Sequence, residues 1–312
     1  RTMVPCGRLM ASFPDPIALS IAERARALRA LQRGSTGRAD ERRLTEIFLG
    51  TTGADLVELK RLHDAASTYR DLVQLVYRDI DDHGLRARIL RHFEEQAALA
   101  ESPRGRKVIS DIDDTLWCNW KDARYPKKTV YPGVLAFLEG LRPGVADAPH
   151  EGVAFLTARP RDRAGLVERL THRRLRSLGI RGATVLSGAL HKVFSSAGIA
   201  EGKLENLLLY RSVYPECELV IVGDSGQGDV ALGLAARREL GASVRGVFIH
   251  DVVATPDDER ARLRERGVTL FDTYAGAAAM ALGADDPARA AMTRVLERDL
   301  EALATAGARV TG

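Results

Sequence analysis

The sequence has few cysteines, no long apolar run and no repeats. Its three cysteines, Cys6, Cys118 and Cys217, are odd in number and form no Cys-x-x-Cys pair, which argues against a disulfide framework and a zinc site. The apolar runs are far shorter than the ~20 residues that a membrane-spanning helix needs. Residues 1–20 hold no sustained apolar segment, so we expect no secretory signal and a cytoplasmic protein.

The 312 residues include 45% hydrophobic and 28% charged residues, a balance that supports a sizeable buried core and excludes a disordered chain or a rod. The net charge is +4, but the basic residues are concentrated. Residues 159–176 contain seven arginines and two acidic residues. Residues 117–131 contain Lys121, Arg124, Lys127 and Lys128 against Asp122 alone. Two basic segments in a near-neutral chain favour an anionic substrate, and no nucleic-acid partner is expected. For any single arginine, a solvated helix face is the simpler alternative.

Residues 1–104 are expected to form an all-helical region. Apolar residues recur at helical spacing in segments 44–62, 72–76 and 89–93. The turn at 50–53 is expected to break the first segment, and Gly84 is expected to cap the C-terminal end of the second. The segment 101–106, with its proline and glycine, predicts a linker.

From residue 105 onward, short β-rich segments alternate with longer amphipathic ones. Strands are expected near 108–112, 153–156, 183–186, 219–222 and 244–249, and helices near 134–141, 161–178, 201–212, 229–240 and 257–266. This alternation predicts an α/β domain over 105–284, Rossmann-like, with a mainly parallel sheet and helices on both faces. The gaps between Asp113 and Gly133 and between Thr157 and Lys203 are too short for a folded cap domain. Residues 285–312 are expected to add a C-terminal helix with Pro287 in its first turn.

The tetrapeptide Asp-Ile-Asp-Asp occurs twice, at 79–82 and at 111–114. The first copy ends a helical segment and is expected to be a solvated helix terminus. The second copy follows an apolar strand. Because residues two apart in a strand point the same way, we expect Asp111 and Asp113 to enter one cleft.

Paired carboxylates at a strand end suit phosphoryl transfer to an aspartate: one attacks phosphorus, and the other exchanges protons with the alcohol and with water. Two carboxylates would repel a phosphate, so such a site needs a cationic side chain and a metal ion to offset the negative charge. Mg²⁺ is the expected metal, because it favours oxygen ligands. Polar residues that could supply these functions lie next to later strands. Thr157 ends the strand near 153–156, and Asp224 and Asp229 follow the strand near 219–222. Lys203 is expected to open the helix before that last strand. Lys192 is the alternative to Lys203.

These motifs carry a resemblance to a known family. Asp111-Ile-Asp-Asp-Thr115, Thr157, Lys203 and Gly223-Asp-Ser-Gly-Gln-Gly-Asp229 follow the order of the four motifs of the haloacid dehalogenase superfamily. Within it, residues 105–280 resemble the catalytic domain of the actin-patch-associated phosphatidate phosphatases, which are relatives of the lipins. The chain departs from that pattern at His250, where relatives usually carry an arginine.

The resemblance implies a role for each motif residue. Asp111 would be the nucleophile, Asp113 the general acid and base, Thr157 a donor to the phosphoryl oxygens, and Lys203 the neutralising cation. The cofactor would be Mg²⁺. The implied metal-site residues are Asp111, Asp113 through its main-chain carbonyl, Asp224, and Asp229 as a neighbour that supports the loop.

The segment that follows Asp113 bears on the substrate. Its two tryptophans lie beside basic residues, a combination that suits an anionic lipid interface, although the tryptophans could equally pack over the site. The candidate substrate-binding residues are Thr115, Arg159, Trp117, Trp120 and Lys121. The leading hypothesis is a phosphatase of phosphatidate or a related lipid phosphate, in peripheral contact with a membrane. The alternatives are a phosphatase of a soluble or protein-bound phosphate, and a non-catalytic lipid-phosphate sensor.

Overall fold

The computed structural model describes residues 18–32, 36–65, 71–142, 153–160, 166–180, 183–188 and 196–282, with isolated positions between 289 and 304. The expected helix that begins near Pro287 therefore lies largely outside the described residues. The chain divides into two compact units, Arg1–Ser102 and Pro103–Gly312. This division falls within the segment 101–106 that predicts a linker.

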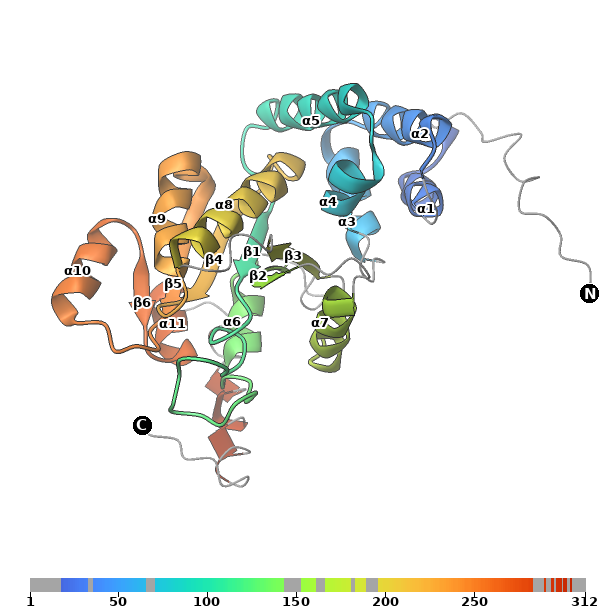
Figure 1. The fold of residues 1–312 in the computed structure, drawn as a ribbon. Helices are drawn as coiled ribbons and strands as arrows, with labels where there is room; N and C mark the ends of the chain where they lie inside the picture. Colours follow the sequence, from blue (N-terminus) through green and yellow to red (C-terminus); the bar gives the residue numbers. More distant parts are fainter. Residues whose placement is uncertain are drawn as a thin grey trace, which may run out of the picture. The chain divides into compact units, whose positions relative to one another are not determined.

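The first unit is helical, as expected. Its helices are α1 (Ile21–Leu31), α2 (Arg38–Leu49), α3 (Gly53–Ala65), the short α4 (Leu72–Gln74), which continues into a π-helical turn (Leu75–Asp79), and α5 (His83–Ala98) (Figure 1). Buried residues of α2 and α5 meet in its core, where Phe48 and Phe93 pack edge to face with ring centroids 5.3 Å apart. The predicted break at residues 50–53 separates α2 from α3.

The prediction for Gly84 is wrong. Asp82 is the N-cap of α5, and its Oδ1 accepts hydrogen bonds from the backbone N–H groups of Gly84 and Leu85. Gly84 therefore lies in the first turn of α5 and does not end the preceding helix. Aspartate is a preferred N-cap residue, so Asp82 is also a signal for the start of a helix. The π-helical turn ends at Asp79 and α5 begins at His83. The end of one helix and the start of the next are therefore too close to be separated from the sequence.

The second unit contains a six-stranded, fully parallel sheet in the order β3-β2-β1-β4-β5-β6. The strands are β1 (Arg106–Ser110), β2 (Val153–Pro160), β3 (Thr184–Gly188), β4 (Glu218–Asp224), β5 (Val244–His250) and β6 (Thr269–Phe271). The predicted α/β Rossmann-like fold is confirmed. Strand β6 was not predicted from the sequence, because three residues are too few for a periodic pattern.

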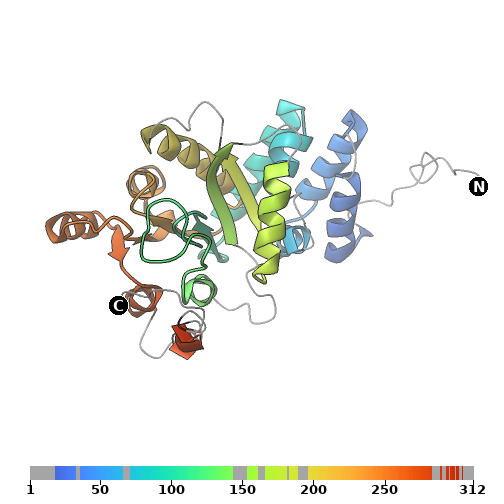
Figure 2. The ribbon, with the colours of Figure 1, turned by 60° about the horizontal axis from the view of Figure 1, so that its bottom comes forward.

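Helices cover both faces of this sheet, as Figure 2 shows. The helices are α6 (Val134–Gly140), α7 (Leu166–Ser177), α8 (Ser196–Val213), α9 (Asp229–Leu240), α10 (Asp257–Glu265) and α11 (Tyr274–Ala281). Buried residues of α6, α7 and α11 share one hydrophobic cluster with β1, β2 and β4. Helices α8 and α9 pack against each other and against the sheet. The sequence did not predict α11, since its run of alanines has no amphipathic period.

The order in which strands are added to the sheet reverses direction between β1 and β4. The chain runs from β1 outward to β3 and then returns through α8 to β4, which pairs with β1. The backbone N–H of Asp111 donates to the carbonyl of Val222, so both strands end side by side. Ligands of open α/β sheets bind at such switch points.

Residues 111–133, all described, form turns and isolated bridges without a folded insertion. In the part of the chain that the structure describes, no helix combines the length and apolar character needed to cross a bilayer.

Candidate active site

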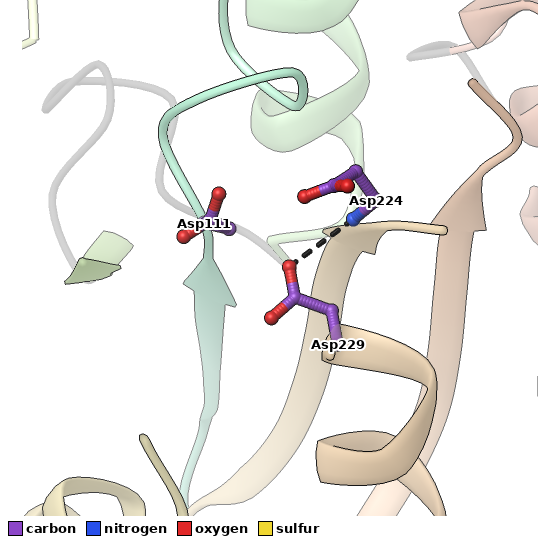
Figure 3. Close-up of side chains that lie close together, drawn as sticks. All are labelled: Asp111, Asp224 and Asp229. Atoms are coloured by element: carbon purple, nitrogen blue, oxygen red, sulfur yellow. Dashed lines mark hydrogen bonds between the residues drawn. The ribbon is translucent and has the colours of Figure 1, made fainter. Parts of the chain in front are cut away.

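Three buried aspartates meet at the carboxyl ends of β1 and β4 (Figure 3). Asp111 follows β1, Asp224 ends β4, and Asp229 begins α9. One carboxylate oxygen from each lies within 4.8 Å of the others. The backbone N–H of Asp224 donates to Oδ2 of Asp229 at 3.2 Å, so Asp229 supports the loop in the way that the resemblance implies.

Lys203 reaches this cluster from α8. Its Nζ lies 2.7 Å from Oδ1 of Asp111 and 2.5 Å from Oδ1 of Asp229. The helix begins at Ser196, so Lys203 lies about two turns inside it, and the expectation that it opens the helix is wrong. Gly198 and Gly202 weaken the helical signal of this first segment. The alternative, Lys192, lies outside the described residues.

The glycines of the loop 223–229 allow this close approach. A Cβ built on Gly223 would lie 2.5 Å from Cβ of Asp229, a separation that no side chain tolerates. Gly228, the N-cap of α9, has a φ of 92°, in the left-handed region that glycine adopts without strain. Close packing against Asp229 therefore explains Gly223, and the left-handed backbone explains Gly228.

Burial and mutual repulsion change the charge state of the cluster. Burial, opposed by the charge of Lys203 and assisted by that of Asp229, raises the pKa of Asp111 to about 7. Burial, followed by the charges of Asp229 and Asp111, raises the pKa of Asp224 well above its usual value. Burial would lower the pKa of Lys203, but the surrounding carboxylates outweigh it and raise the pKa. The lysine is thus a permanent cation among three carboxyl groups.

Asp113 is held differently from Asp111. Its Oδ1 accepts hydrogen bonds from Nε1 of Trp117 and from Nδ2 of Asn119, both at 3.0 Å. Asp113 lies close enough to Asp111 for its charge to raise the pKa of Asp111. Its side chain is not part of the buried group formed by the carboxylates of Asp111, Asp224 and Asp229.

The third carboxylate of the motif, Asp114, was not singled out from the sequence. It is buried with a φ of 59°, and its carboxylate accepts hydrogen bonds from three successive backbone N–H groups, those of Asn119, Trp120 and Lys121. This contact fixes the start of the loop 114–133. An aspartate is one of the few non-glycine residues that adopt such a φ.

The two tryptophans of that loop have different environments. Trp117 is fully buried, and the guanidinium of Arg174 lies 4.0 Å from its ring centroid. The expectation that Trp117 contacts a lipid surface is therefore wrong, because the indole packs inward to reach Asp113. Trp120 is 67% exposed, and Nζ of Lys127 lies 5.9 Å from its ring centroid. Lys121 is also exposed.

The other predicted residues have mixed outcomes. Thr157 is buried in β2, two residues beyond the pairing of Phe155 with Ser110, at the same edge of the sheet as Asp111. Thr115 is fully buried, and its Oγ1 has no hydrogen-bond partner among the described residues. Arg159 lies in β2, but its side chain is outside the described residues.

His250, at the end of β5, joins the loop to the sheet. Its Nδ1 lies 3.1 Å from the carbonyl oxygen of Asp114, and its Nε2 lies 3.0 Å from Nη2 of Arg124. A guanidinium can only donate, so Nε2 accepts and Nδ1 carries the proton. Burial lowers the pKa of His250, which keeps this neutral tautomer. The guanidinium of Arg124 therefore places a cation directly beside His250.

The donor set fits a divalent cation. In this buried cluster, three carboxyl groups face one ammonium, and Oδ2 of Asp224 is buried without a hydrogen-bond partner among the described residues. An orphaned carboxylate oxygen is costly unless a cation satisfies it. Asp224 and Asp111 are the candidate ligands, because both oxygens of Asp229 are already engaged by Lys203 and by the backbone of Asp224.

Comparison with protein-family models, with curated proteins and with solved structures gave no match.

Proposed function

We propose that this protein is a Mg²⁺-dependent phosphomonoesterase that forms an aspartyl-phosphate on Asp111, and that its substrate is a lipid phosphate such as phosphatidate. The contact of 2.7 Å between Nζ of Lys203 and Oδ1 of Asp111, beside the unpartnered oxygen of Asp224, carries the proposal. The resemblance to the actin-patch-associated phosphatidate phosphatases agrees with it.

The chemistry follows from the positions of the two carboxylates. An oxygen of Asp111 attacks phosphorus, the bond from phosphorus to the alcohol oxygen breaks, and Asp113 gives its proton to the departing alcohol. Water then attacks phosphorus, Asp113 takes a proton from it, and the bond to Asp111 breaks. Inorganic phosphate leaves and both aspartates return to their first state.

Lys203 serves both steps by offsetting negative charge. It lies between Asp111 and Asp229, so it lowers the repulsion between the attacking carboxylate and the dianionic ester. Mg²⁺ held by Asp224 and Asp111 would neutralise further phosphoryl charge. Thr157, at the same edge of the sheet, is the proposed donor to a phosphoryl oxygen.

The loop that follows Asp113 favours a lipid substrate. The loop that follows Asp113 holds no folded insertion, and Trp120 projects from it beside Lys121 and Lys127. An exposed indole next to lysines suits the surface of an anionic bilayer. Trp117 is fully buried and therefore cannot contact a membrane surface.

The test is phosphate release from phosphatidate in mixed micelles, beside a panel of soluble phosphomonoesters, with Mg²⁺ and with EDTA. We expect release that EDTA abolishes and Mg²⁺ restores, and that favours phosphatidate. Trp120→Ala should also weaken binding to anionic vesicles. Release only from soluble esters would support the phosphomonoesterase mechanism and refute the proposed lipid phosphate substrate. If the protein binds phosphatidate but releases no phosphate from any ester, it is a sensor and the proposal fails.

A further inference from the structure

Helix α7 carries a row of exposed arginines that the proposed reaction does not use. Arg169, Arg173 and Arg176 are all exposed, and residues at this spacing lie along one face of a helix. Thr171 and Leu175, on the opposite face, are buried, and Leu175 belongs to the hydrophobic cluster over the sheet. The packing of α7 therefore turns the arginine row toward solvent.

Neighbouring acidic groups do not neutralise this row. Neither Arg173 nor Arg176 makes a hydrogen bond or an ion pair with any residue that the structure describes. Helix α10 shows the ordinary arrangement of a solvated helix, because Arg262 pairs there with Asp258 of the same helix. A row of unpaired charges of one sign attracts anions, so the arginines of α7 need a different explanation from those of α10.

An apolar side chain lies among these cations. Leu170 is 64% exposed, and it lies one helical turn from Arg173 and Arg174. Arginines can bind lipid headgroups while a leucine beside them enters the boundary of the acyl chains. The phosphates and sugars of a nucleic acid would also attract the arginines, but they give an exposed leucine no apolar contact.

The arginine row is continuous with the loop beside the candidate active site. Nη2 of Arg174 donates to the carbonyl of Lys128 at 3.2 Å, so α7 lies against the loop 114–133. That loop carries the exposed Trp120, with Nζ of Lys127 at 5.9 Å from its ring centroid. Helix and loop thus combine exposed cations with two exposed apolar side chains next to Asp113.

We propose that the arginine face of α7, formed by Arg169, Leu170, Arg173 and Arg176, binds the surface of an anionic bilayer together with Trp120. The arginines bind lipid headgroups, and Leu170 and Trp120 enter the boundary between headgroups and acyl chains. This contact would hold the site against the layer that contains its substrate. The choice of a bilayer as partner rests on the proposed function.

The experiment measures co-sedimentation with vesicles of phosphatidylcholine and with vesicles that also contain phosphatidylserine. Phosphatidylserine supplies negative charge without a phosphomonoester, so the candidate active site has no substrate in this assay. We expect the wild-type protein to bind the phosphatidylserine vesicles about tenfold more tightly or better. High salt should remove this preference, because it screens exposed charges.

The variant Arg173→Gln with Arg176→Gln removes two charges from the arginine face. It should weaken binding to phosphatidylserine vesicles by about tenfold or more, as expected when two basic residues leave an anionic surface. Leu170→Ser should weaken it by about threefold or more, since it removes an apolar contact with the bilayer.

The matched control is Arg264→Gln with Arg266→Gln, which removes two exposed arginines at the C-terminal end of α10. This helix leads into β6, and α7 leads into β3, at the other edge of the sheet. Because salt screens charges beyond about 10 Å, the control should bind the vesicles within about twofold of the wild type.

Wild-type binding by the α7 variant, or an equal loss in the control, would overturn the inference. Loss of binding to a single-stranded oligonucleotide, with vesicle binding retained, would identify a nucleic acid as the partner and overturn it as well. The vesicle assay involves no turnover, so the two proposals fail separately. The expected vesicle pattern without any phosphate release would refute the proposed function, and phosphate release from phosphatidate without that pattern would refute the role of α7.

Discussion

The same four residues, Asp-Ile-Asp-Asp, occur in both units of the chain, but only the second copy forms part of a buried cluster of charged side chains. The copy at 79–82 joins the π-helical turn to α5, and the copy at 111–114 follows β1. The isoleucine is completely buried in both, Ile80 in one and Ile112 in the other. An apolar anchor is therefore common to the two copies, and the difference lies in what surrounds the carboxylates.

The first copy makes local contacts, and the second makes distant ones. Backbone N–H groups, first that of Leu85 and then that of Gly84, lower the pKa of Asp82 at the exposed start of α5. Asp111 instead meets Lys203, which lies 92 residues further along the chain, and burial raises its pKa to about 7. A motif thus becomes a reactive site when topology brings distant charged groups to it.

The largest expected effect separates the two copies by activity. Asp111→Asn is nearly isosteric and removes the proposed nucleophile, so phosphate release should fall at least about a thousandfold. The matched variant is Asp79→Asn, in which the hydrogen bond from Nε2 of Gln32 can still be accepted by the amide oxygen. It should change phosphate release by less than about twofold. Comparable losses in both variants would mean that the second copy has no special chemistry.

The second prediction tests the glycines that lie against each copy. Gly223→Ala places a Cβ 2.5 Å from Cβ of Asp229, so the loop that meets Asp111 must move. We expect a loss of about 1–3 kcal/mol in the free energy of urea unfolding, typical of overpacking, together with weaker Mg²⁺ binding by calorimetry.

The control for that variant is Gly84→Ala in α5. Its Cβ would lie 3.2 Å from Oδ1 of Asp82, and alanine favours the helix, so the two effects oppose each other. The stability should stay within about 1 kcal/mol of the wild type. If Gly223→Ala is equally mild and retains Mg²⁺ binding, the close approach of the loop to Asp229 is not what builds the site.

The architecture of the second unit was largely readable from the sequence. Alternating β-rich and amphipathic segments gave five of the six strands near their observed bounds, because buried parallel strands are continuous apolar runs. The meeting of Asp111 with Asp224 and Asp229 was also expected, since the carboxyl ends of neighbouring parallel strands share one edge. The place of Lys203, which lies inside α8, was implied by the family resemblance.

What the sequence could not supply was the direction of individual side chains. Trp117 and Trp120 lie three residues apart in the same loop, yet one is buried and the other exposed. The carboxylate of Asp114 accepts hydrogen bonds from the backbone at 119–121 and so fixes the path of the loop between the two indoles. This contact depends on the left-handed φ of Asp114, which cannot be read from the sequence pattern. The inward-facing ring of Trp117 lies against the guanidinium of Arg174, and only the packing of α7 brings that arginine near.

The smallest expected effect is on stability as a function of pH, and its sign differs between the two copies. A carboxyl with a raised pKa binds its proton more tightly in the folded state. In the metal-free protein, Asp111 should therefore raise the stability as the pH falls from about 7 toward its unfolded value of 3.8. A carboxyl with a lowered pKa, as in Asp82, stabilises above 3.8, and its contribution is lost as the pH falls through its folded pKa.

Urea unfolding of metal-free Asp111→Asn and Asp82→Asn, measured against the wild type from pH 8 to pH 3, separates these contributions. The stability of Asp111→Asn relative to the wild type should fall between pH 8 and pH 5, because the variant lacks the carboxyl that takes up a proton there. The stability deficit of Asp82→Asn should be constant over that range and shrink only below about pH 4. Saturating Mg²⁺ should flatten the first trend, since a metal ion requires the ionised carboxylate. If Asp111→Asn and the wild type instead share one slope between pH 8 and pH 5, burial does not set the charge state of Asp111, and only Lys203 distinguishes it from the exposed copy.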